Sequence, residues 1–82
     1  MTTPESIERD IARGLPCDHL TVEGDGQHFQ AVIVSNAFEG KRPIQRNQLV
    51  YAVLGDRMKA EIHALSMQTL TPAEWAARSS PA

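Results

Sequence analysis

The stretch His28-Phe29-Gln30-Ala31-Val32-Ile33-Val34-Ser35 decides the fold that we predict for this 82-residue chain. It closes on a continuous apolar run, which is typical of a strand buried on both faces and hence of a central strand. Before it, His19-Leu20-Thr21-Val22-Glu23 alternates with a period of two, and Gly24-Asp25-Gly26 has turn chemistry. We therefore expect an antiparallel hairpin. The two glycines predict no phosphate site, because no helix follows them.

The residues after the central strand predict a crossover to a third strand. A helix begins at Pro43 and ends at Gly55, and residues 56–61 are typical of one or two further helical turns. Ile62-His63-Ala64-Leu65-Ser66-Met67-Gln68-Thr69 then indicates a strand. Because the connection contains a helix, we expect this strand to lie parallel to the central one.

Helices are predicted at both ends of the chain. The first begins at Pro4 with Thr3 as its N-cap. It ends near Gly14 and presents one apolar stripe, made by Ile7, Ile11 and Leu15. Thr71-Pro72-Ala73-Glu74 is a capping box that predicts a short last helix carrying Trp75, with residues 76–82 as a frayed tail.

The predicted order is α-β-β-α-(α)-β-α in a single domain, residues 1–82. This is an α+β fold of two layers, with helices on one face of a three-stranded mixed sheet. A chain of this size buries a small core. We therefore expect a site on the surface, or one shared with a partner, and no small-molecule substrate held in a deep cavity.

Composition excludes several classes of protein. The formal net charge is −2, which argues against a uniformly basic nucleic-acid binder. The apolar runs are too short for a membrane helix, and the first residues lack the pattern of a signal peptide. The single cysteine cannot form an internal disulfide, which is typical of a reducing compartment. We therefore expect a cytoplasmic protein that does not contact a membrane.

No constellation of catalytic residues is present, so we do not expect an enzyme. Ser35 and Ser66 lack the G-x-S-x-G elbow of a hydrolase. Cys17 precedes Asp18, and a neighbouring acid raises the pKa of a thiol instead of activating it. Cys17 is therefore interpreted as a packing residue.

The histidines leave two interpretations open. His19, His28 and His63 are not spaced as in a zinc site. Spacing alone favours a structural role for His63, satisfied within its own chain. An exposed histidine at the start of a strand, however, can supply one ligand to a metal centre that a partner completes.

Basic residues gather around the predicted second helix. They are Lys41, Arg42 and Arg46, with Arg57 further along the chain. One interpretation is a solvated helix face, and the other is a helix-turn-helix-like surface that contacts nucleic acid. Four such charges would give a shallow salt dependence of binding.

Taken together, several stretches resemble the BolA family, most closely its short-loop bacterial branch of the IbaG or YrbA type. The resemblance covers about Cys17 to Trp75 and implies a fold like that of a class II KH domain. The matching stretches, in the family's order, are His28-Phe29, Val32-Ile33-Val34-Ser35, Phe38-Glu39-Gly40, Gln45-Arg46-Asn47-Gln48-Leu49-Val50-Tyr51, Ile62-His63-Ala64-Leu65-Ser66 and Thr69-Leu70-Thr71-Pro72-Ala73-Glu74-Trp75.

The resemblance implies a non-enzymatic adaptor in iron–sulfur homeostasis. BolA-like proteins pair with monothiol glutaredoxins, and the complex holds a [2Fe–2S] cluster together with glutathione. The ligand histidine of the family precedes Ala-Leu at the start of the last strand, and His63 matches it. The second family ligand lies in a longer hairpin loop than the one here, so His28, Asp25 or no residue at all remain open for that role.

Some members of the family are transcription regulators of stress or morphology genes. For DNA binding, the resemblance implies Lys41, Arg42, Arg46 and Arg57 as the contacting residues. The chain contains no G-x-x-G loop of the KH type, and Arg46 is followed by asparagine where the family has histidine.

Overall fold

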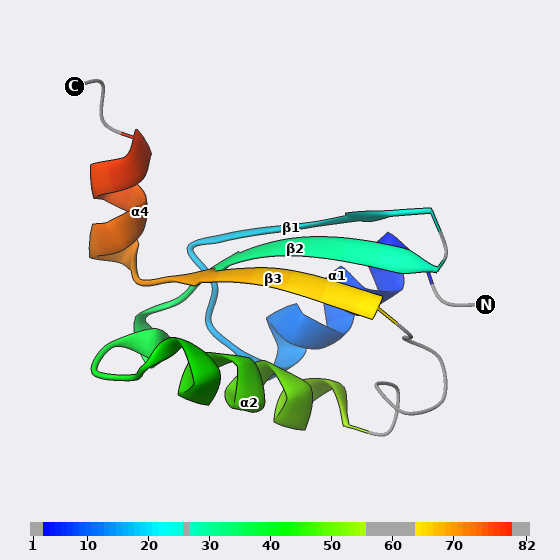
Figure 1. Cartoon of the computed structure of the whole chain (residues 1–82), viewed down its shortest axis with the longest axis horizontal. Coiled ribbons are helices and arrows are strands. Elements are labelled where there is room, and N and C mark those ends of the chain that lie inside the picture. The colour runs from blue at the N-terminus through cyan, green and yellow to red at the C-terminus, as the bar shows by residue number, and fades with distance from the viewer. Residues whose placement is uncertain (1–2, 26, 56–63, 80–82) are drawn as a thin grey trace.

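The computed structural model describes residues 3–25, 27–55 and 64–79. The predicted strands and helices are present in the predicted order (Figure 1). The predicted helical turn at residues 56–61 lies outside the described residues. The elements are α1 (Pro4–Gly14), β1 (His19–Gly24), β2 (His28–Val34), the short 3₁₀ helix η1 (Asn36–Phe38), α2 (Pro43–Leu54), β3 (Ala64–Leu70) and α4 (Pro72–Ser79).

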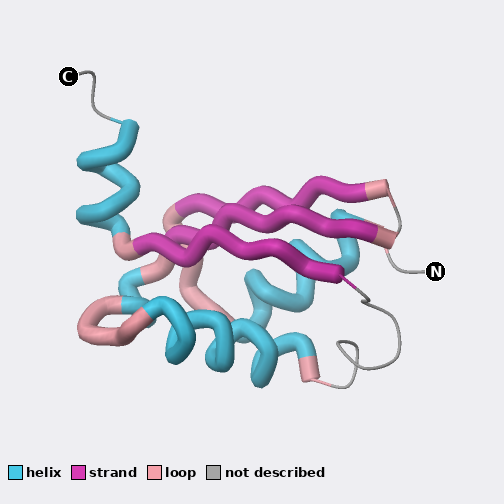
Figure 2. The backbone as a smooth tube through the Cα atoms, viewed as in Figure 1, coloured by secondary structure: helices cyan, strands magenta, loops and turns pink. Residues whose placement is uncertain are grey.

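The sheet has the predicted mixed topology, with β2 at its centre. Strand β1 runs antiparallel to β2, with His19 of β1 opposite Val34 of β2. Strand β3 runs parallel to β2, with Ala64 of β3 opposite His28 of β2. Helices α1 and α2 lie against one face of the sheet and form the second layer of the fold (Figure 2). We call this covered face of the sheet the inner face and the opposite one the outer face. The α+β sandwich of two layers is therefore confirmed.

The core lies between the inner face of the sheet and these two helices. The central strand supplies Phe29, Ala31 and Ile33, which alternate with residues that point outward. The remaining buried members of this core are Ile7, Ile11, Leu15, Phe38, Val50 and Leu54. The stripe predicted for the first helix is therefore confirmed.

The prediction that β2 is buried on both faces is wrong for most of its length. Gln30 is exposed and Val32 is half-buried, because none of the helices that the structure describes covers the outer face of the sheet. Only at the end of the strand is the outer side closed, where Val34 is fully buried. Its neighbour in β1 is His19, whose ring stacks on Trp75 of α4 with centroids 4.5 Å apart.

The helix ends follow the predicted local chemistry. The Thr3 hydroxyl accepts from the Ser6 N–H across 3.1 Å at the start of α1. Helix α2 ends at Gly55, which adopts a φ of 60° that residues with a side chain rarely adopt. Where the two helices meet, Gly14 leaves room for Val53, whose Cγ1 would lie 2.4 Å from a Cβ at position 14.

Helix α4 departs from the sequence-based expectation in two ways. It does not lie on the inner face but projects from the end of β3 (Figure 1). It also continues to Ser79, so the prediction that the chain frays after Trp75 is wrong for residues 76–79. Alanine and arginine favour the helix here, and Arg78 Nη1 donates to Gln68 Oε1 of β3.

Candidate functional site

The end of the sheet at which β2 and β3 begin carries the candidate metal ligand His28. Its side chain is 75% exposed, and its backbone pairs with Ala64, the first residue of β3. His63 precedes Ala64 in the sequence and lies outside the described residues. His28 therefore faces solvent at the strand end to which the sequence assigned the metal ligand.

Asp25, the other open choice for a second ligand, closes the hairpin turn. Its Oδ1 accepts from the backbone N–H groups of Gln27 and His28, both at 2.9 Å. These bonds, the one from His28 first, hold the pKa of the Asp25 carboxyl below its usual value. Its Oδ2 lies 3.8 Å from His28 Nδ1. The carboxylate is thus occupied in the turn, while the imidazole remains exposed to solvent.

The cysteine lies at the opposite end of the sheet from His28. Cys17 precedes β1, whose first residue pairs with the last residue of β2. A strand of this length spans about 20 Å at ~3.3 Å per residue. Burial, followed by the nearby Asp18 charge, raises the pKa of the Cys17 thiol. This agrees with the interpretation of Cys17, which packs against the core, as a packing residue.

Within residues 3–25, 27–55 and 64–79, no three His, Cys, Asp or Glu side chains are placed to hold a metal ion. His28 and Asp25 are the closest approach to such a group, with Glu23 beside them around a shallow depression of about 310 Å³. The described part of the chain therefore offers single ligands and no complete metal site.

The arginine proposed for nucleic-acid contacts is bound within the protein. Arg46 Nη1 and Nη2 contact the two carboxylate oxygens of Glu74 at 2.7 and 3.2 Å. Its Nη1 also donates to the Thr69 carbonyl, and its Nε donates to the Lys41 carbonyl. The side chain is only 11% exposed. We call this set of contacts the Arg46 clamp, and it connects α2, the end of β3 and α4.

The electrostatics of the Arg46 clamp follow from its geometry. The hydrogen bond from Arg46, and then that from the Thr71 N–H, lower the pKa of Glu74 to about 2. The Thr71 bond completes the predicted capping box, because the Glu74 N–H donates to the Thr71 hydroxyl in return. The capping box was predicted from the sequence. The ion pair of Glu74 with Arg46 was not, because the two residues are 28 positions apart in the chain.

Two of the remaining basic candidates, Lys41 and Arg42, are exposed. Lys41 and Arg42 stand in the connection before α2, and neither forms an ion pair within the part of the chain that the structure describes. Arg57 lies outside the described residues. The predicted basic surface is therefore represented by two free cations, beside a third that the Arg46 clamp holds.

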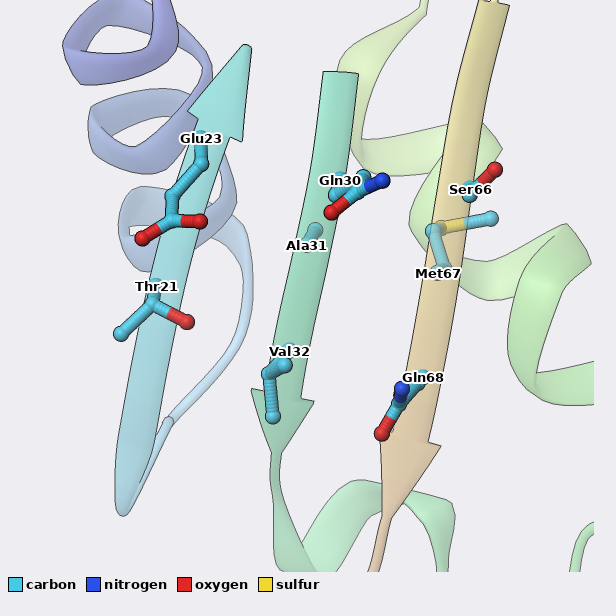
Figure 3. A pocket seen from close by; sticks show the side chains of 8 residues that line it. All are labelled: Thr21, Glu23, Gln30, Ala31, Val32, Ser66, Met67 and Gln68. Carbon is cyan, nitrogen blue, oxygen red and sulfur yellow. The ribbon is translucent and has the colours of Figure 1, made fainter.

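The outer face of the sheet has a broad polar depression of about 450 Å³ that sequence reasoning did not single out. Side chains from all three strands line it (Figure 3). The period-two alternation of polar residues in the strands was the available signal. The polar residues that line it are Thr21, Glu23, Gln30, Ser66 and Gln68.

These features define a small two-layer α+β protein whose candidate groups lie on open surfaces. No helix that the structure describes is both long and apolar enough to span a bilayer. Residues 10–74 match the family model described as BolA-like protein. The chain belongs to the BolA family, which confirms the resemblance found in the sequence.

Named relatives agree with this assignment. The chain is 42% identical over 72 residues to "BolA-like protein 1" of Bos taurus, covering 88% of this chain and 51% of that protein. It is 39% identical over 88 residues to "DNA-binding transcriptional regulator BolA" of Haemophilus influenzae, covering 95% and 85%. It is 37% identical over 71 residues to "Acid stress protein IbaG" of Escherichia coli, covering 85% and 84%, in agreement with the short-loop branch.

The chain spans about half the length of the mammalian relatives that it matches. Among solved structures, a BolA-like protein from Babesia bovis superimposes with a TM-score of 0.87 at 34% identity. That match covers 98% of this chain and 96% of the other. The relatives are named as BolA-like, regulatory or stress proteins, and none of these names is that of an enzyme.

Proposed function

We propose that this protein is an adaptor that binds a monothiol glutaredoxin and supplies a histidine ligand to a [2Fe–2S] cluster, which it then helps to pass on. The observation that carries the proposal is the His63-Ala64-Leu65 sequence, which lies inside the stretch that matches the BolA-like model. The cluster is the cargo of the complex, and its other ligands come from the glutaredoxin and glutathione.

The described residues support a shared cluster over one that this chain holds alone. The single cysteine is half-buried, has a raised pKa and lies at the other end of the sheet from His28. His28 is exposed beside Ala64, the residue that follows His63 in the sequence. A neutral imidazole in place of a thiolate makes a cluster less negative and raises its potential. Protonation of that imidazole also makes its bond to the cluster labile, which suits transfer of the cluster.

The proposal is tested by replacing His63. The protein is mixed with a monothiol glutaredoxin, glutathione, iron and sulfide, and visible circular dichroism follows the cluster. Adding the wild-type chain should change the spectrum of the glutaredoxin cluster, and His63→Ala should abolish that change. His28→Ala serves as the comparison, since it alters the spectrum only if His28 is the second ligand. Identical spectra and cluster lifetimes for wild type and His63→Ala would show that His63 is not a ligand.

A second candidate function is DNA binding, for which the exposed cations before α2 are the supporting observation. The side chains of Lys41 and Arg42 have no partner among the described residues, and one relative is named as a DNA-binding regulator. Arg46 is bound to Glu74, so we assign the phosphate contacts to the two exposed residues. The net charge of −2 limits how strongly such a surface attracts DNA.

This second function predicts a small and specific loss in one variant. Arg42→Ala should weaken DNA binding equally for all sequences and reduce the slope of log affinity against log salt by about one. Affinity is measured by titration across a range of salt concentrations. Glu39→Gln, a nearby exposed change that leaves both cations in place, is the control. A slope that is the same for wild type and Arg42→Ala would remove Arg42 from the contacts.

A further inference from the structure

The two edges of the sheet differ, and no strand that the structure describes pairs with the edge formed by β3. The Ser35 N–H donates to the Leu70 carbonyl across 2.9 Å, so the peptide groups of Leu70 face β2. Backbone groups alternate between the two sides of a strand, which places those of Leu65, Met67 and Thr69 on the opposite side. Arg46 Nη1, which reaches the Thr69 carbonyl from α2, independently confirms that direction.

Most of this edge has no hydrogen-bond partner among residues 3–25, 27–55 and 64–79. The Arg46 clamp satisfies Thr69, but no residue that the structure describes bonds to the edge-facing groups of Leu65 and Met67. Unpaired N–H and C=O groups in an extended strand form a template on which another strand can add. The chemistry that matches this edge is therefore the backbone of a second, extended polypeptide.

The sequence of β3 does not protect its edge. Proteins block open edges with charges, proline or a bulge. Strand β3 (Ala64–Leu70) has no charged residue and no proline, and its register with β2 is continuous. The other edge strand, β1, contains Glu23 and is flanked by Asp18 and Asp25. The difference between the two edges favours strand addition at β3.

The open edge also begins at the candidate ligand. Ala64, the first residue of β3, follows His63 in the sequence. Helix α2 packs beside β3 and exposes two large apolar side chains, Ile44 at 66% and Tyr51 at 40%. A partner that follows this edge from Ala64 towards Thr69, where Arg46 of α2 reaches the strand, would meet backbone groups and, on the neighbouring helix, exposed apolar surface.

We propose that the partner that carries the cluster adds an extended, uncharged segment of its own chain to the β3 edge as a fourth strand, hydrogen-bonded to Leu65 and Met67. This inference rests on the proposed function and specifies the interface through which that function operates. Hydrogen bonds from the backbone would supply affinity, and pockets for alternate side chains of the added segment would supply specificity.

The test removes one edge N–H, that of Met67, whose side chain packs against the core. In Met67→Pro, the missing N–H faces away from β2, a position at which an edge strand tolerates proline. Because that variant also restricts the backbone, a chemically synthesised chain with N-methylated Met67 retains the side chain and keeps the test valid. Ser66→Ala, on the outer face of the same strand, is the matched control.

Affinity for a monothiol glutaredoxin with glutathione is measured by titration, and amide hydrogen exchange is followed in the free chain and in the complex. We expect the amides of Leu65 and Met67 to become protected in the complex. N-methylation of Met67 should weaken binding by about tenfold, because one hydrogen bond is lost and the methyl group keeps the partner's backbone away from the edge. Ser66→Ala should bind as wild type does.

Four results would overturn the proposal. A complex in which the two amides exchange as they do in the free chain would mean that the partner binds elsewhere. Protection already present in the free chain would mean that the edge is covered by the chain itself, or by a second copy if the protection rises with concentration. Absence of any complex would defeat the proposed function as well. A cluster spectrum that depends on His63 but not on Met67 N-methylation would overturn the strand addition alone.

Discussion

Replacing Arg46 by alanine should lower the free energy of unfolding by about 2–4 kcal/mol, because charged hydrogen bonds are lost and carbonyls lose their donor. The guanidinium is 11% exposed and contacts the Thr69 and Lys41 carbonyls as well as Glu74. For a domain of this size, the loss corresponds to a fall in the melting temperature of roughly 10–20 °C. Thermal unfolding followed by far-ultraviolet circular dichroism measures it.

Two variants distinguish the Arg46 clamp from a general effect of charge. Arg42→Ala removes an exposed arginine from the N-terminal end of the same helix and should change stability little. Glu74→Gln keeps an oxygen for the Thr71 N–H but loses the carboxylate. Equal stability of Arg46→Ala and Arg42→Ala would contradict the assigned role of Arg46.

The contribution of the carboxylate depends on pH in a defined direction. The pKa of Glu74 is lowered to about 2 in the folded protein, from an ordinary value of 4.5. A lowered pKa stabilises the fold above the unfolded value, and this stabilisation is lost as pH falls through the folded value. The stability advantage of wild type over Glu74→Gln should thus be complete above about pH 4.5 and decline towards pH 2.

Gly24→Ala should be the second strongly destabilising substitution, at about 2–3 kcal/mol. A Cβ at this position would lie 2.5 Å from the His28 carbonyl oxygen and 2.6 Å from Phe29 Cδ1. That carbonyl accepts from the Asp25 N–H in the turn, and Phe29 is buried in the core, so neither neighbour can move freely. Denaturant titration compares the variant with wild type.

Gly40 is the control for a glycine effect that does not depend on packing. It has a φ of 76°, and nothing lies within 4 Å of an added Cβ. Gly40→Ala therefore costs only the strain of the left-handed conformation, about 1–2 kcal/mol. If Gly24→Ala proves no more destabilising than Gly40→Ala, the close approach at the hairpin carries no energetic weight.

Elements with strong local signals could be predicted from the sequence. The Thr3 cap, the Thr71 box and the apolar stripe of α1 each lie within one or two helical turns, so neighbouring residues determine them. The parallel arrangement of β3 followed from the crossover helix. The burial of β2 did not follow, because the apolar run could not indicate that the described helices α1 and α2 cover only one face of the sheet.

The site was less predictable because its contacts are distant in sequence. The sequence analysis grouped Arg46 with neighbouring cations. Its hydrogen-bond acceptor, Glu74, is 28 residues further along the chain and gave no local signal. The stack of His19 on Trp75 likewise joins residues of β1 and α4 that are far apart in the sequence. His63 entered through its family context alone, and that assignment stays a prediction. The position of His28 at the start of a strand was predicted from the sequence, but its exposure to solvent was not.

The stack of Trp75 on His19 gives the protein a spectroscopic property. The chain has a single tryptophan, so all of its indole fluorescence comes from the junction between α4 and the sheet. That junction lies at the end of β2 remote from His28, about 20 Å away by strand length. An absorbing cluster held at the His28 end, as the proposed function requires, would quench this emission by energy transfer, so the unlabelled protein could report its binding and release.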